Sequence, residues 1–541
     1  MNRAPTVTVD SVSFAWPDGT PVFDNLSAGF GAARIGLIGR NGSGKTTLLR
    51  LIAGELLPAS GAITTAGLVG YLPQGRRRER AAVADALGIT DVLRARAAIE
   101  CGATDQAHYD LLDGRWDRPE RALALLAEAG LPHTLADLHR PAISVSGGEW
   151  TLICLLGVLL ANPDILLLDE PTNDLDGVAR RRLGDVLDGW TGPVVVVSHD
   201  RDLLEGVDAV AELRRGSIAT YSGPFSDYLD AKDAEQDAAD RAVRVAAEHL
   251  KREKQQKADA QIALARRQRY ARSDHQNKRR PKVVMNERKR QAQVSAGKYR
   301  LLHEGKVEQA RSDLSDAQLA AQQDDHVRID LPETAVPAGK TVLVLRQGAH
   351  TLPVAGTDRI ALVGPNGSGK TTLLELIARS AHSTPATGIE AEGPHVPFAY
   401  LDQHLDTLNP DATVLHHVRH TATGRPENEI RAQLARLLIR GRQADQRVGD
   451  LSGGERLRVA LATALLTLPA PQLLLLDEPT NNLDLPSTAE LVEALSAYRG
   501  ALIVASHDEP FLRDIRTART WESTRPDRLP SESLGTQEPN R

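Results

Sequence analysis

Two short, fully apolar runs divide the sequence into similar halves. Residues 165–168 and 473–476 contain only Ile and Leu, and each run ends in an Asp-Glu pair. Apolar runs of this length are typical of parallel strands that are buried on both faces. Residues 6–13 instead alternate between polar and apolar side chains, which predicts an edge-type strand. The pattern predicts an α/β fold with a buried strand in each half.

A long stretch between the two halves has a helical composition. Residues 227–271 contain no Pro or Gly and are dense in Ala, Glu, Gln, Lys and Arg, which are strong helix formers. Residues 281–323 place apolar side chains three and four positions apart, although Gly297 and Gly305 interrupt this pattern. The turn-rich run 273–281 ends in a proline, which suits the first turn of a returning helix. A helical hairpin is therefore predicted, with arms of roughly 60 Å at 1.5 Å per residue.

Charge sets this hairpin apart from the rest of the chain. Residues 251–300 contain 17 Lys or Arg against 4 Asp or Glu, a net charge of +13, and because the whole chain is at −6 the remainder is at −19. A basic segment on an acidic body favours contact with a polyanion at one place. Val283–Met285 could instead close the tip of the hairpin against each other, and the sequence leaves both readings open. The residues predicted to make the contact are Lys278, Arg279, Arg280, Lys282, Val283, Val284, Met285, Arg288, Lys289 and Arg290.

A glycine-rich loop occurs once in each half, between an apolar strand and a helix-forming run. Both copies match the P-loop pattern, whose amides wrap phosphates, whose lysine reaches the β- and γ-phosphates and whose threonine binds Mg²⁺. Trp16 precedes the first copy, and we favour stacking on adenine over a place in the core. The predicted ATP-binding residues of the two loops are Gly39, Asn41, Gly42, Gly44, Lys45, Thr46, Thr47, Gly364, Asn366, Gly367, Gly369, Lys370, Thr371 and Thr372.

A serine followed by two glycines and a glutamate also recurs, and each copy opens a helix-forming run. The serine suits an N-cap, and the glycines allow a phosphate to approach the N-terminus of the helix. A second anion site in each half is best explained if it completes the P-loop of the other half. The predicted members of these signature motifs are Ser146, Gly147, Gly148, Ser452, Gly453 and Gly454.

The acidic pair after each apolar run has the composition of a hydrolytic site. Its aspartate is predicted to hold Mg²⁺ with the P-loop threonine, and its glutamate to orient or activate the water that attacks the γ-phosphate. A histidine stands 30 residues after each aspartate, in Ser-His-Asp, and is predicted to sense the γ-phosphate. Contiguous residues cannot form a hydrolase triad, so that reading is rejected. A glutamine after a matching short strand in each half is assigned to the metal and attacking water. The predicted metal ligands are Thr46, Asp169, Thr371 and Asp477, and the predicted catalytic residues are Glu170, Glu478, His199, His507, Gln74 and Gln403.

Equal spacing indicates an internal duplication. The signature serines are 306 residues apart, and the aspartates and the histidines are each 308 residues apart. From the P-loop lysine to the signature serine there are 101 residues in the first half and 82 in the second. The first half therefore has about 19 extra residues, assigned to the helical region 82–132 as either a contact arm or a tolerated loop insertion.

These patterns predict a first P-loop domain at residues 1–224, a basic hairpin linker at 225–330, a second P-loop domain at 331–521 and a disordered polar tail at 522–541. Cys101 and Cys154 are too few for a disulfide framework and lack zinc-site spacing, which favours a reducing cytoplasm. The longest apolar run, residues 152–161, is well below the 18 or more residues of a membrane span, and the start has no signal-peptide pattern. No membrane segment is predicted.

The duplicated motifs, in this order, resemble the ATP-binding cassette superfamily. Two fused cassettes with a charged helical hairpin between them resemble its ABC-F family, over the chain up to about Trp521. The resemblance implies a monomer whose cassettes close over two ATP molecules with Mg²⁺. It also implies binding of the ribosome near the exit site for tRNA, with the hairpin pointing toward the peptidyl-transferase centre and contacting rRNA. The basic run 278–290 is similar to linkers of actinobacterial members that protect ribosomes from antibiotics.

Some positions depart from the family pattern. Leu152 stands where the family usually has a basic residue, and no aromatic precedes the second P-loop as Trp16 precedes the first. The two ATP sites are therefore expected to be unequal, with the site that uses Lys370, Glu478 and the first signature the more altered one. A general translation factor, an energy-coupling subunit of a transporter and a DNA-repair or chromosome ATPase remain alternatives. The transporter subunit has no use for a basic hairpin, and the DNA ATPase would need zinc-binding cysteine pairs or a longer coil.

Overall fold

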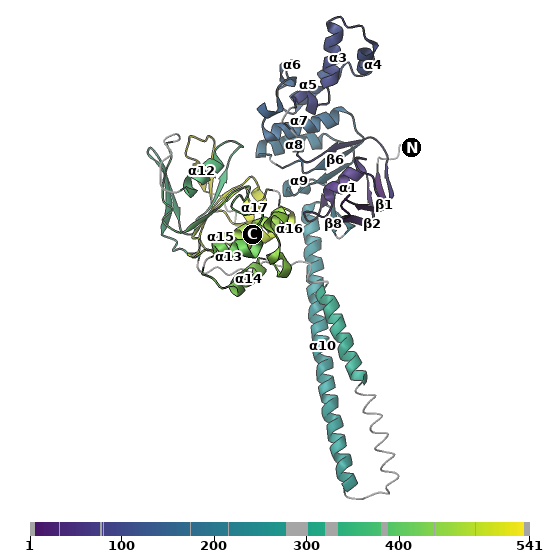
Figure 1. Ribbon diagram of the computed structural model, residues 1–541, viewed down its shortest axis with the longest axis vertical. Coiled ribbons are helices and arrows are strands. Elements are labelled where there is room, and N and C mark those ends of the chain that lie inside the picture. The colour runs from purple at the N-terminus through teal and green to yellow at the C-terminus, as the bar shows by residue number, and fades with distance from the viewer. Residues whose placement is uncertain are drawn as a thin grey trace. The chain divides into compact units, whose positions relative to one another are not determined.

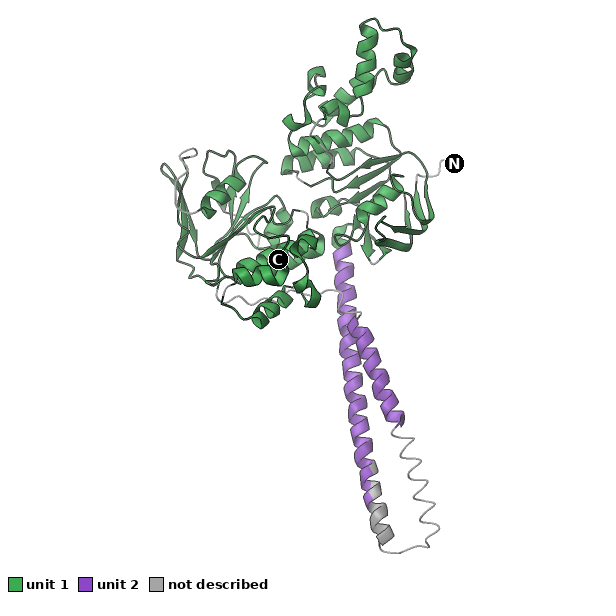
Figure 2. Cartoon of the chain, in the orientation of Figure 1, with its two compact units in different colours: residues 1–227, 327–541 green, residues 228–326 purple. Residues whose placement is uncertain are grey.

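The computed structural model describes residues 6–31, 33–75, 78, 81–173, 175–214, 216–276, 301–319, 334–379, 388–422, 424–437, 439–481 and 483–534 (Figure 1). The chain divides into two compact units, one made of Met1–Asp227 and Val327–Arg541 and the other of Tyr228–His326 (Figure 2). The first unit holds both predicted P-loop domains. Within the described residues, no helix combines the length and the apolar composition that crossing a bilayer requires.

The first domain is built on two sheets. The larger sheet has the strand order β5 (Val69–Leu72), β6 (Ile165–Asp169), β7 (Val194–Val197), β3 (Arg34–Ile38), β8 (Ala209–Arg214) and β9 (Ser217–Ser222). All neighbours in it are parallel except β8 and β9. The smaller, antiparallel sheet has the order β2 (Pro21–Phe30), β1 (Val7–Ala15) and β4 (Ser60–Thr65). The fully apolar β6 and β7 are buried along their whole length, as their composition predicts.

Helices surround these sheets, and one core lies between the sheets. The core of the first domain joins Val9 and Phe23 of the small sheet to Leu167 and Val195 of the large one. Leu48 of the P-loop helix packs in the same cluster, which fixes the loop against the sheet. The helices that flank the large sheet are α1 (Lys45–Ile52), α7 (Gly147–Leu160), α8 (Gly177–Asp188) and α9 (Arg201–Glu205).

The region predicted to hold the extra residues of the first half is helical. It contains α2 (Val83–Ala86), α3 (Thr90–Glu100), α4 (Gln106–Leu112), α5 (Arg118–Glu128), α6 (Leu135–Leu138) and the 3-10 helix η1 (Ala142–Ser144). Helices α3 and α4 pack on each other through Val92, Ala95 and Leu112, and extend beyond α5 and α7 in Figure 1. Because this pair has its own small core, the extra residues form an ordered helical arm.

The second domain repeats this plan. Its larger sheet has the order β14 (Phe398–Leu401), β15 (Leu473–Asp477), β16 (Ala501–Ala505), β12 (Arg359–Val363), β17 (Arg519–Glu522) and β18 (Ser531–Leu534). Its smaller sheet has the order β11 (His350–Ala355), β10 (Thr341–Gln347) and β13 (Glu390–Glu392). The helices are α12 (Lys370–Ala378), α13 (Val414–Thr421), α14 (Glu427–Arg436), η3 (Gly441–Asp445), η4 (Val448–Asp450), α15 (Gly453–Leu465), α16 (Leu485–Ala497) and α17 (Glu509–Asp514). The predicted α/β fold with two P-loop domains is confirmed.

The linker forms the predicted helical hairpin. Its first arm, α10 (Phe225–Gln276), has 52 residues, which is about 78 Å at 1.5 Å per residue. Residues 301–319 are helical and return along it. Leu250 packs with Val307, Ala310 and Leu314 in a small apolar cluster, so the predicted apolar face of the returning helix does contact the first arm. The predicted tip residues Lys278–Arg290 lie outside the described residues.

The prediction of a disordered tail from residue 522 is wrong for residues 522–534. β18 pairs antiparallel with β17, and the 3% exposed Ser523 and 7% exposed Leu529 are buried in the link between them. The composition is polar and contains proline, which suggested disorder. Pairing with an existing sheet edge supplies the backbone hydrogen bonds that such a sequence cannot supply alone.

Candidate nucleotide-binding sites

Each P-loop connects a central strand to a helix that starts at the P-loop lysine. Gly44 and Gly369, which precede α1 and α12, have φ of 100° and 93°, a conformation that L side chains rarely adopt. The ammonium of Lys45 donates to the carbonyl oxygens of Gly39 at 2.7 Å and Arg40 at 3.3 Å. Lys370 donates in the same way to Gly364 at 2.8 Å. In this form each lysine is folded back on its own loop, and burial lowers the pKa of both.

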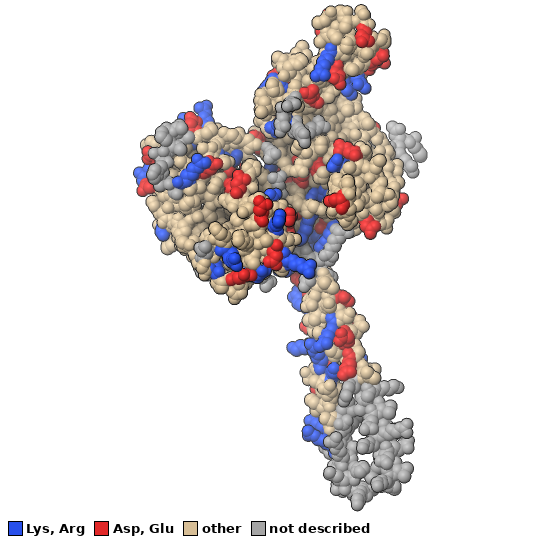
Figure 3. Space-filling model, in the orientation of Figure 1, with Lys and Arg blue, Asp and Glu red and all other residues tan. Residues whose placement is uncertain are grey.

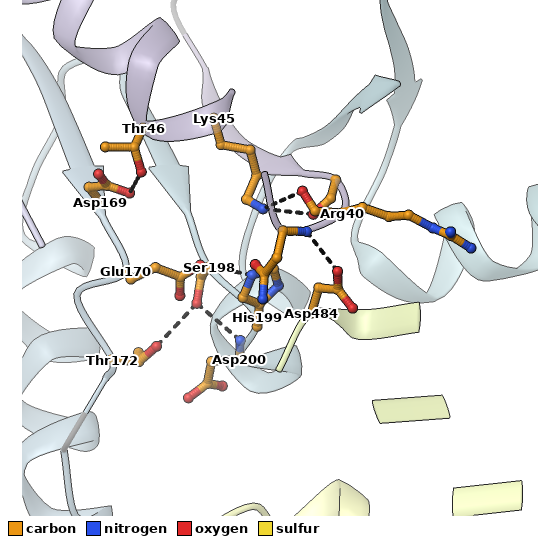
Figure 4. A network of polar contacts seen from close by, with 12 residues as sticks. Arg40, Lys45, Thr46, Asp169, Glu170, Thr172, Ser198, His199, Asp200 and Asp484 are labelled. Carbon is orange, nitrogen blue, oxygen red and sulfur yellow. Dashed lines mark hydrogen bonds and ion pairs between the residues drawn. The ribbon is translucent and has the colours of Figure 1, made fainter. Parts of the chain in front are cut away.

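The residues after β6 and β15 are buried and strained. Glu170 and Glu478 have φ of 48° and 44°, the left-handed region, which costs about 1–3 kcal/mol for a residue with a side chain. Each backbone amide donates to the neighbouring strand, to Val197 O or to Ala505 O, at 2.8 Å. Figure 4 shows the side chain of Glu170 pointing into the space beside the first P-loop.

A histidine faces each glutamate. His199 Nε2 lies 3.1 Å from Glu170 Oε1, and His507 Nε2 lies 3.4 Å from Glu478 Oε1. Burial raises the pKa of Glu170 to about 8 and that of Glu478 to about 7. Burial also lowers the pKa of His199 to about 3 and that of His507 to about 4. Both histidines are therefore neutral at physiological pH, and both glutamates can gain or lose a proton near neutrality.

The surroundings of the two histidines differ. The ammonium of Lys370 lies 2.8 Å from His507 Nε2, and Asn366 Oδ1 lies 3.1 Å from the same nitrogen. In the first domain, the contacts of Lys45 are instead with the carbonyl oxygens of its loop. The serine before each histidine has a structural role. Ser198 is fully buried; its Oγ accepts a hydrogen bond from the amide of Asp200 and lies 3.1 Å from Thr172 Oγ1. Ser506 is also fully buried, and its Oγ accepts from the amide of Asp508.

The residues predicted to hold Mg²⁺ have the donor set that this ion needs. The Thr46 hydroxyl donates to Asp169 Oδ1 at 3.3 Å, which brings the two predicted ligands together. Asp477 is 2% exposed, and within the described part of the chain neither of its carboxylate oxygens has a hydrogen-bond partner. An orphaned buried carboxylate beside a threonine hydroxyl is a fit for a hard cation.

Sequence reasoning missed Tyr71. Its hydroxyl donates to Asp169 Oδ2 at 3.3 Å, and so it orients the carboxylate predicted to hold the metal. Tyr400 has the equivalent place, and Asp477 contributes to raising its pKa, after the larger effect of burial. The signal was available, because each tyrosine precedes the repeated glutamine by three residues. Gln74 and Gln403 themselves are exposed, and they follow strands β5 and β14 beside the strands that carry the acidic pairs.

The signature serines begin their helices as predicted. Ser146 Oγ accepts from the amide of Glu149 at 3.3 Å, and Glu149 in turn accepts from the amide of Ser146 at 3.1 Å. Ser452 and Glu455 form the same reciprocal cap on α15. Gly148 also has a packing role, because a Cβ there would lie 2.7 Å from Ala179 Cβ on α8. No described hydrogen bond joins either signature serine to a P-loop.

The departure at Leu152 is coupled to a second one. In the second domain the equivalent residue Arg458 forms an ion pair with Glu490 of α16 at 2.8 Å, and both side chains are largely buried. In the first domain Leu152 is buried, and Arg182 stands at the position of Glu490. Both members of the ion pair therefore differ in the first domain, with Leu152 in place of the arginine and Arg182 in place of the glutamate. No buried carboxylate is left there that would need a basic partner.

Trp16 is half-buried at the end of β1. It packs against the core cluster of the first domain and meets Phe14 edge to face, with ring centroids 5.3 Å apart. One part of the indole is therefore in the core and another part is open to solvent. This placement is compatible with both interpretations of Trp16, packing in the core and stacking on adenine. The core holds the ring in place, and its exposed part can still contact a base.

A family model described as ABC transporter matches residues 25–173 and 350–481. The chain is 32% identical to the tylosin resistance ATP-binding protein TlrC of Streptomyces fradiae, over 88% of this chain and 89% of that protein. It is 30% identical to the energy-dependent translational throttle protein EttA of Escherichia coli O6:H1, over 94% and 91%. The chain belongs to the ABC-F family of ATPases.

Other similarities agree with this assignment. The ABC-F protein Uup of Haemophilus influenzae is 32% identical over 89% of this chain and 73% of its own. A solved structure of RNase-L Inhibitor covers 98% of this chain with a TM-score of 0.56 and 18% identity, which shows a shared fold. As an ABC-F protein, the chain is an ATP hydrolase, and its two cassettes are the two P-loop domains described above.

Proposed function

We propose that this ABC-F ATPase binds the ribosome in its ATP-bound, closed state and protects it from antibiotics that act at the peptidyl-transferase centre or exit tunnel. ATP hydrolysis then releases the protein. The name of one relative, a tylosin resistance protein, supports the protective role. The name of another, a translational throttle protein, supports a role in translation.

The observation that carries ribosome binding is the basic outer part of α10, because residues 251–276 contain 8 Lys or Arg against 3 Asp or Glu, whereas residues 225–250 contain 3 against 7. Lys251, Arg252, Lys254, Arg266 and Arg269 are all exposed on the described part of this helix. Figure 3 shows Lys and Arg side chains on the hairpin, with Asp and Glu side chains between them on its upper part. A helix of about 78 Å carries these charges well away from its own base. Exposed guanidinium and ammonium groups at intervals along a rod suit the phosphates of folded RNA.

The ATP sites take the roles expected of cassettes. Lys45 and Lys370 leave their loop carbonyls to bind the β- and γ-phosphates. Thr46 with Asp169, and Thr371 with Asp477, would hold Mg²⁺, which would supply positive charge beside the phosphates. Each glutamate then accepts a proton from the attacking water, and the neutral histidine beside it senses the γ-phosphate. Site one is completed by Ser452 and Gly454 of the second domain, and site two by Ser146 and Gly148 of the first.

The test separates ribosome binding from catalysis. Glu170→Gln with Glu478→Gln keeps the shape of both sites and removes both proton acceptors, so the closed state should persist. With ATP, this double variant should sediment with ribosomes at physiological salt and stall translation. Expression of the unmodified chain in a sensitive host should raise the inhibitory concentrations of macrolides, lincosamides, streptogramins or pleuromutilins. Ribosome occupancy that does not respond to ATP would count against the proposal.

A general translation factor is the second candidate, favoured by the likeness to the translational throttle protein. Such a factor would bind ribosomes equally well but leave drug sensitivity unchanged. The resistance measurement therefore separates the two candidates, while sedimentation tests what they share.

A further inference from the structure

Different elements cover the start of the P-loop helix in the two cassettes. In the first, a Cβ on Gly44 would lie 2.8 Å from atoms of Val22 and Phe23 on β2. In the second, a Cβ on Gly369 would lie 2.6 Å from Pro526 Cα, far along the chain. The second P-loop is therefore walled by a segment that has no counterpart in the first.

This segment is the link between β17 and β18, residues 523–530, called the C-terminal loop below. In the first cassette the equivalent strands β8 and β9 are joined by a tight turn, since Arg214 pairs with Ser217. In the second, Glu522 pairs with Ser531, and the intervening residues extend over the P-loop. The link between β17 and β18 is thus longer than the link between β8 and β9, and it lies beside the second P-loop.

Gln347 fixes the C-terminal loop in place. Its side-chain amide donates to Asp527 O at 2.7 Å, and its carbonyl oxygen accepts from the amide of Leu529 at 2.7 Å. Ser523 Oγ also donates to Ser368 O in the P-loop at 2.7 Å. Gln347 is the last residue of β10, and Trp16 follows the last residue of β1. Where the first cassette has an aromatic ring, the second therefore has an anchor for this loop.

A cavity lies between the C-terminal loop and the P-loop helix. Its walls are Gly369, Thr372, Leu373, Leu376 and Ile389 on one side, and Ser523, Arg525, Pro526 and Arg528 on the other. Lys370 reaches the β- and γ-phosphates in a P-loop, so the α-phosphate and the sugar that follows it lie toward the start of the helix. The cavity beside Thr372 borders the start of this helix.

We propose that Arg525 and Arg528 hold the purine base of ATP at the second site, in place of an aromatic residue. A planar guanidinium stacks on the face of a base. This contact needs no hydrogen bonds to the edge of the base. Both arginines are exposed, and within the described residues neither is in an ion pair. The inference rests on the second P-loop being an ATP site.

Calorimetric titration of the full-length chain tests this proposal, with Mg²⁺ present throughout. A Lys45→Ala background weakens site one, so that binding reports on site two. In that background, Arg525→Ala with Arg528→Ala should weaken ATP binding about tenfold, the effect of losing stacking on one base. Affinity for inorganic tripolyphosphate, which has no base, should be unchanged. Equal losses for both ligands would assign the arginines to phosphate and overturn the proposal, as would no loss for either.

Three controls keep the result interpretable. In a Lys370→Ala background the same double change should leave ATP affinity unaltered, because site one does not use the C-terminal loop. Arg442→Ala removes an exposed arginine elsewhere in the second cassette and should have no effect. Gln347→Ala, which frees the loop, should reproduce the selective loss for ATP. A Lys45→Ala chain that binds tripolyphosphate but gains nothing from the base would refute the inference while leaving ribosome binding, measured by sedimentation, untouched.

Discussion

The carboxylate of Asp484 accepts a hydrogen bond from the backbone amide of Asn41 at 2.7 Å. Asn41 belongs to the first P-loop, whereas Asp484 follows the acidic pair of the second cassette. The other oxygen of Asp484 caps α16 by accepting from the amide of Ser487 at 2.9 Å. One side chain thus ties the start of a helix in one cassette to the phosphate-binding loop of the other (Figure 4). This contact is a physical basis for coupling between the two sites.

Asp484→Asn should weaken the contact with the first P-loop and so reduce ATP hydrolysis several-fold, while the cap of α16 is kept. The amide oxygen can still cap α16, since Asn is as good an N-cap as Asp. Its NH₂ group would then face the amide of Asn41, and an unsatisfied donor of this kind costs about 1–3 kcal/mol. Steady-state hydrolysis and thermal unfolding of the same samples check the two effects. Asp105→Asn, which makes the same change at the cap of α4 in the helical arm, is the matched control, and equal losses from both would contradict a special role of Asp484.

The raised pKa of Glu170 makes stability depend on pH. Burial raises this pKa from 4.5 to about 8, so the folded protein keeps a proton that the unfolded chain has lost. Between these values the folded state binds more protons, and its stability falls as pH rises. The fall is at most about 1.4 kcal/mol per pH unit for one group. His199, with its pKa lowered to about 3, contributes only below its unfolded value near 6.5, where stability rises with pH.

Glu170→Gln should therefore become more stabilising as pH rises from about 5 to 8, and the gain should level off above pH 8. Glutamine imitates the protonated carboxyl and never ionises, so the variant escapes the cost of a buried charge. The difference in melting temperature between variant and unmodified chain, measured without nucleotide at each pH, reports this effect. The control is Glu455→Gln, which changes a residue of the N-terminal cap of α15. This variant should show no such trend. A pH-independent difference for Glu170→Gln would show that this carboxyl does not titrate in that range.

Most of the candidate sites could be predicted because their motifs are local in sequence. A P-loop, an acidic pair after an apolar strand and a serine before a helix each fix their own geometry within about ten residues. Glu170 and Glu478 fell at the predicted strand ends, and their histidines lie within 3.4 Å of them. Tyr71 was missed although it is repeated as Tyr400, because a tyrosine in a strand is most simply read as packing.

What could not be predicted depends on contacts between distant segments. The C-terminal loop has a polar, proline-containing composition, and only its pairing with β17 and its bonds to Gln347, about 180 positions away, give it order. The coupled change of Leu152 and Arg182 is likewise invisible without α7 and α8 side by side. A single sequence does not show which distant residues are in contact, so neither relationship could be predicted from it.

Replacing Arg458 alone should lower the free energy of unfolding more than replacing both Arg458 and Glu490. Arg458→Leu leaves Glu490 buried without its main partner, and we expect a loss of about 2–4 kcal/mol in the free energy of unfolding. Adding Glu490→Gln removes the stranded charge and should recover most of the loss. Urea unfolding of the single and double variants measures both steps. If the double variant is as unstable as Arg458→Leu alone, packing and not charge decides the cost.

The exposed basic residues of α10 should set how ribosome binding depends on salt. Replacing Lys251, Arg252 and Lys254 by Ala removes up to three phosphate contacts, each of which contributes about 0.7–0.9 to the slope of log affinity against log salt. Affinity of the Glu170→Gln, Glu478→Gln chain for ribosomes should fall, and the slope should become shallower by about 2. Lys340→Ala is the control variant. It removes an exposed lysine of the second cassette and should leave the slope unchanged. A slope that does not respond to the triple change would mean that this face of α10 does not contact RNA, and the attraction would then have to arise elsewhere on an otherwise acidic protein.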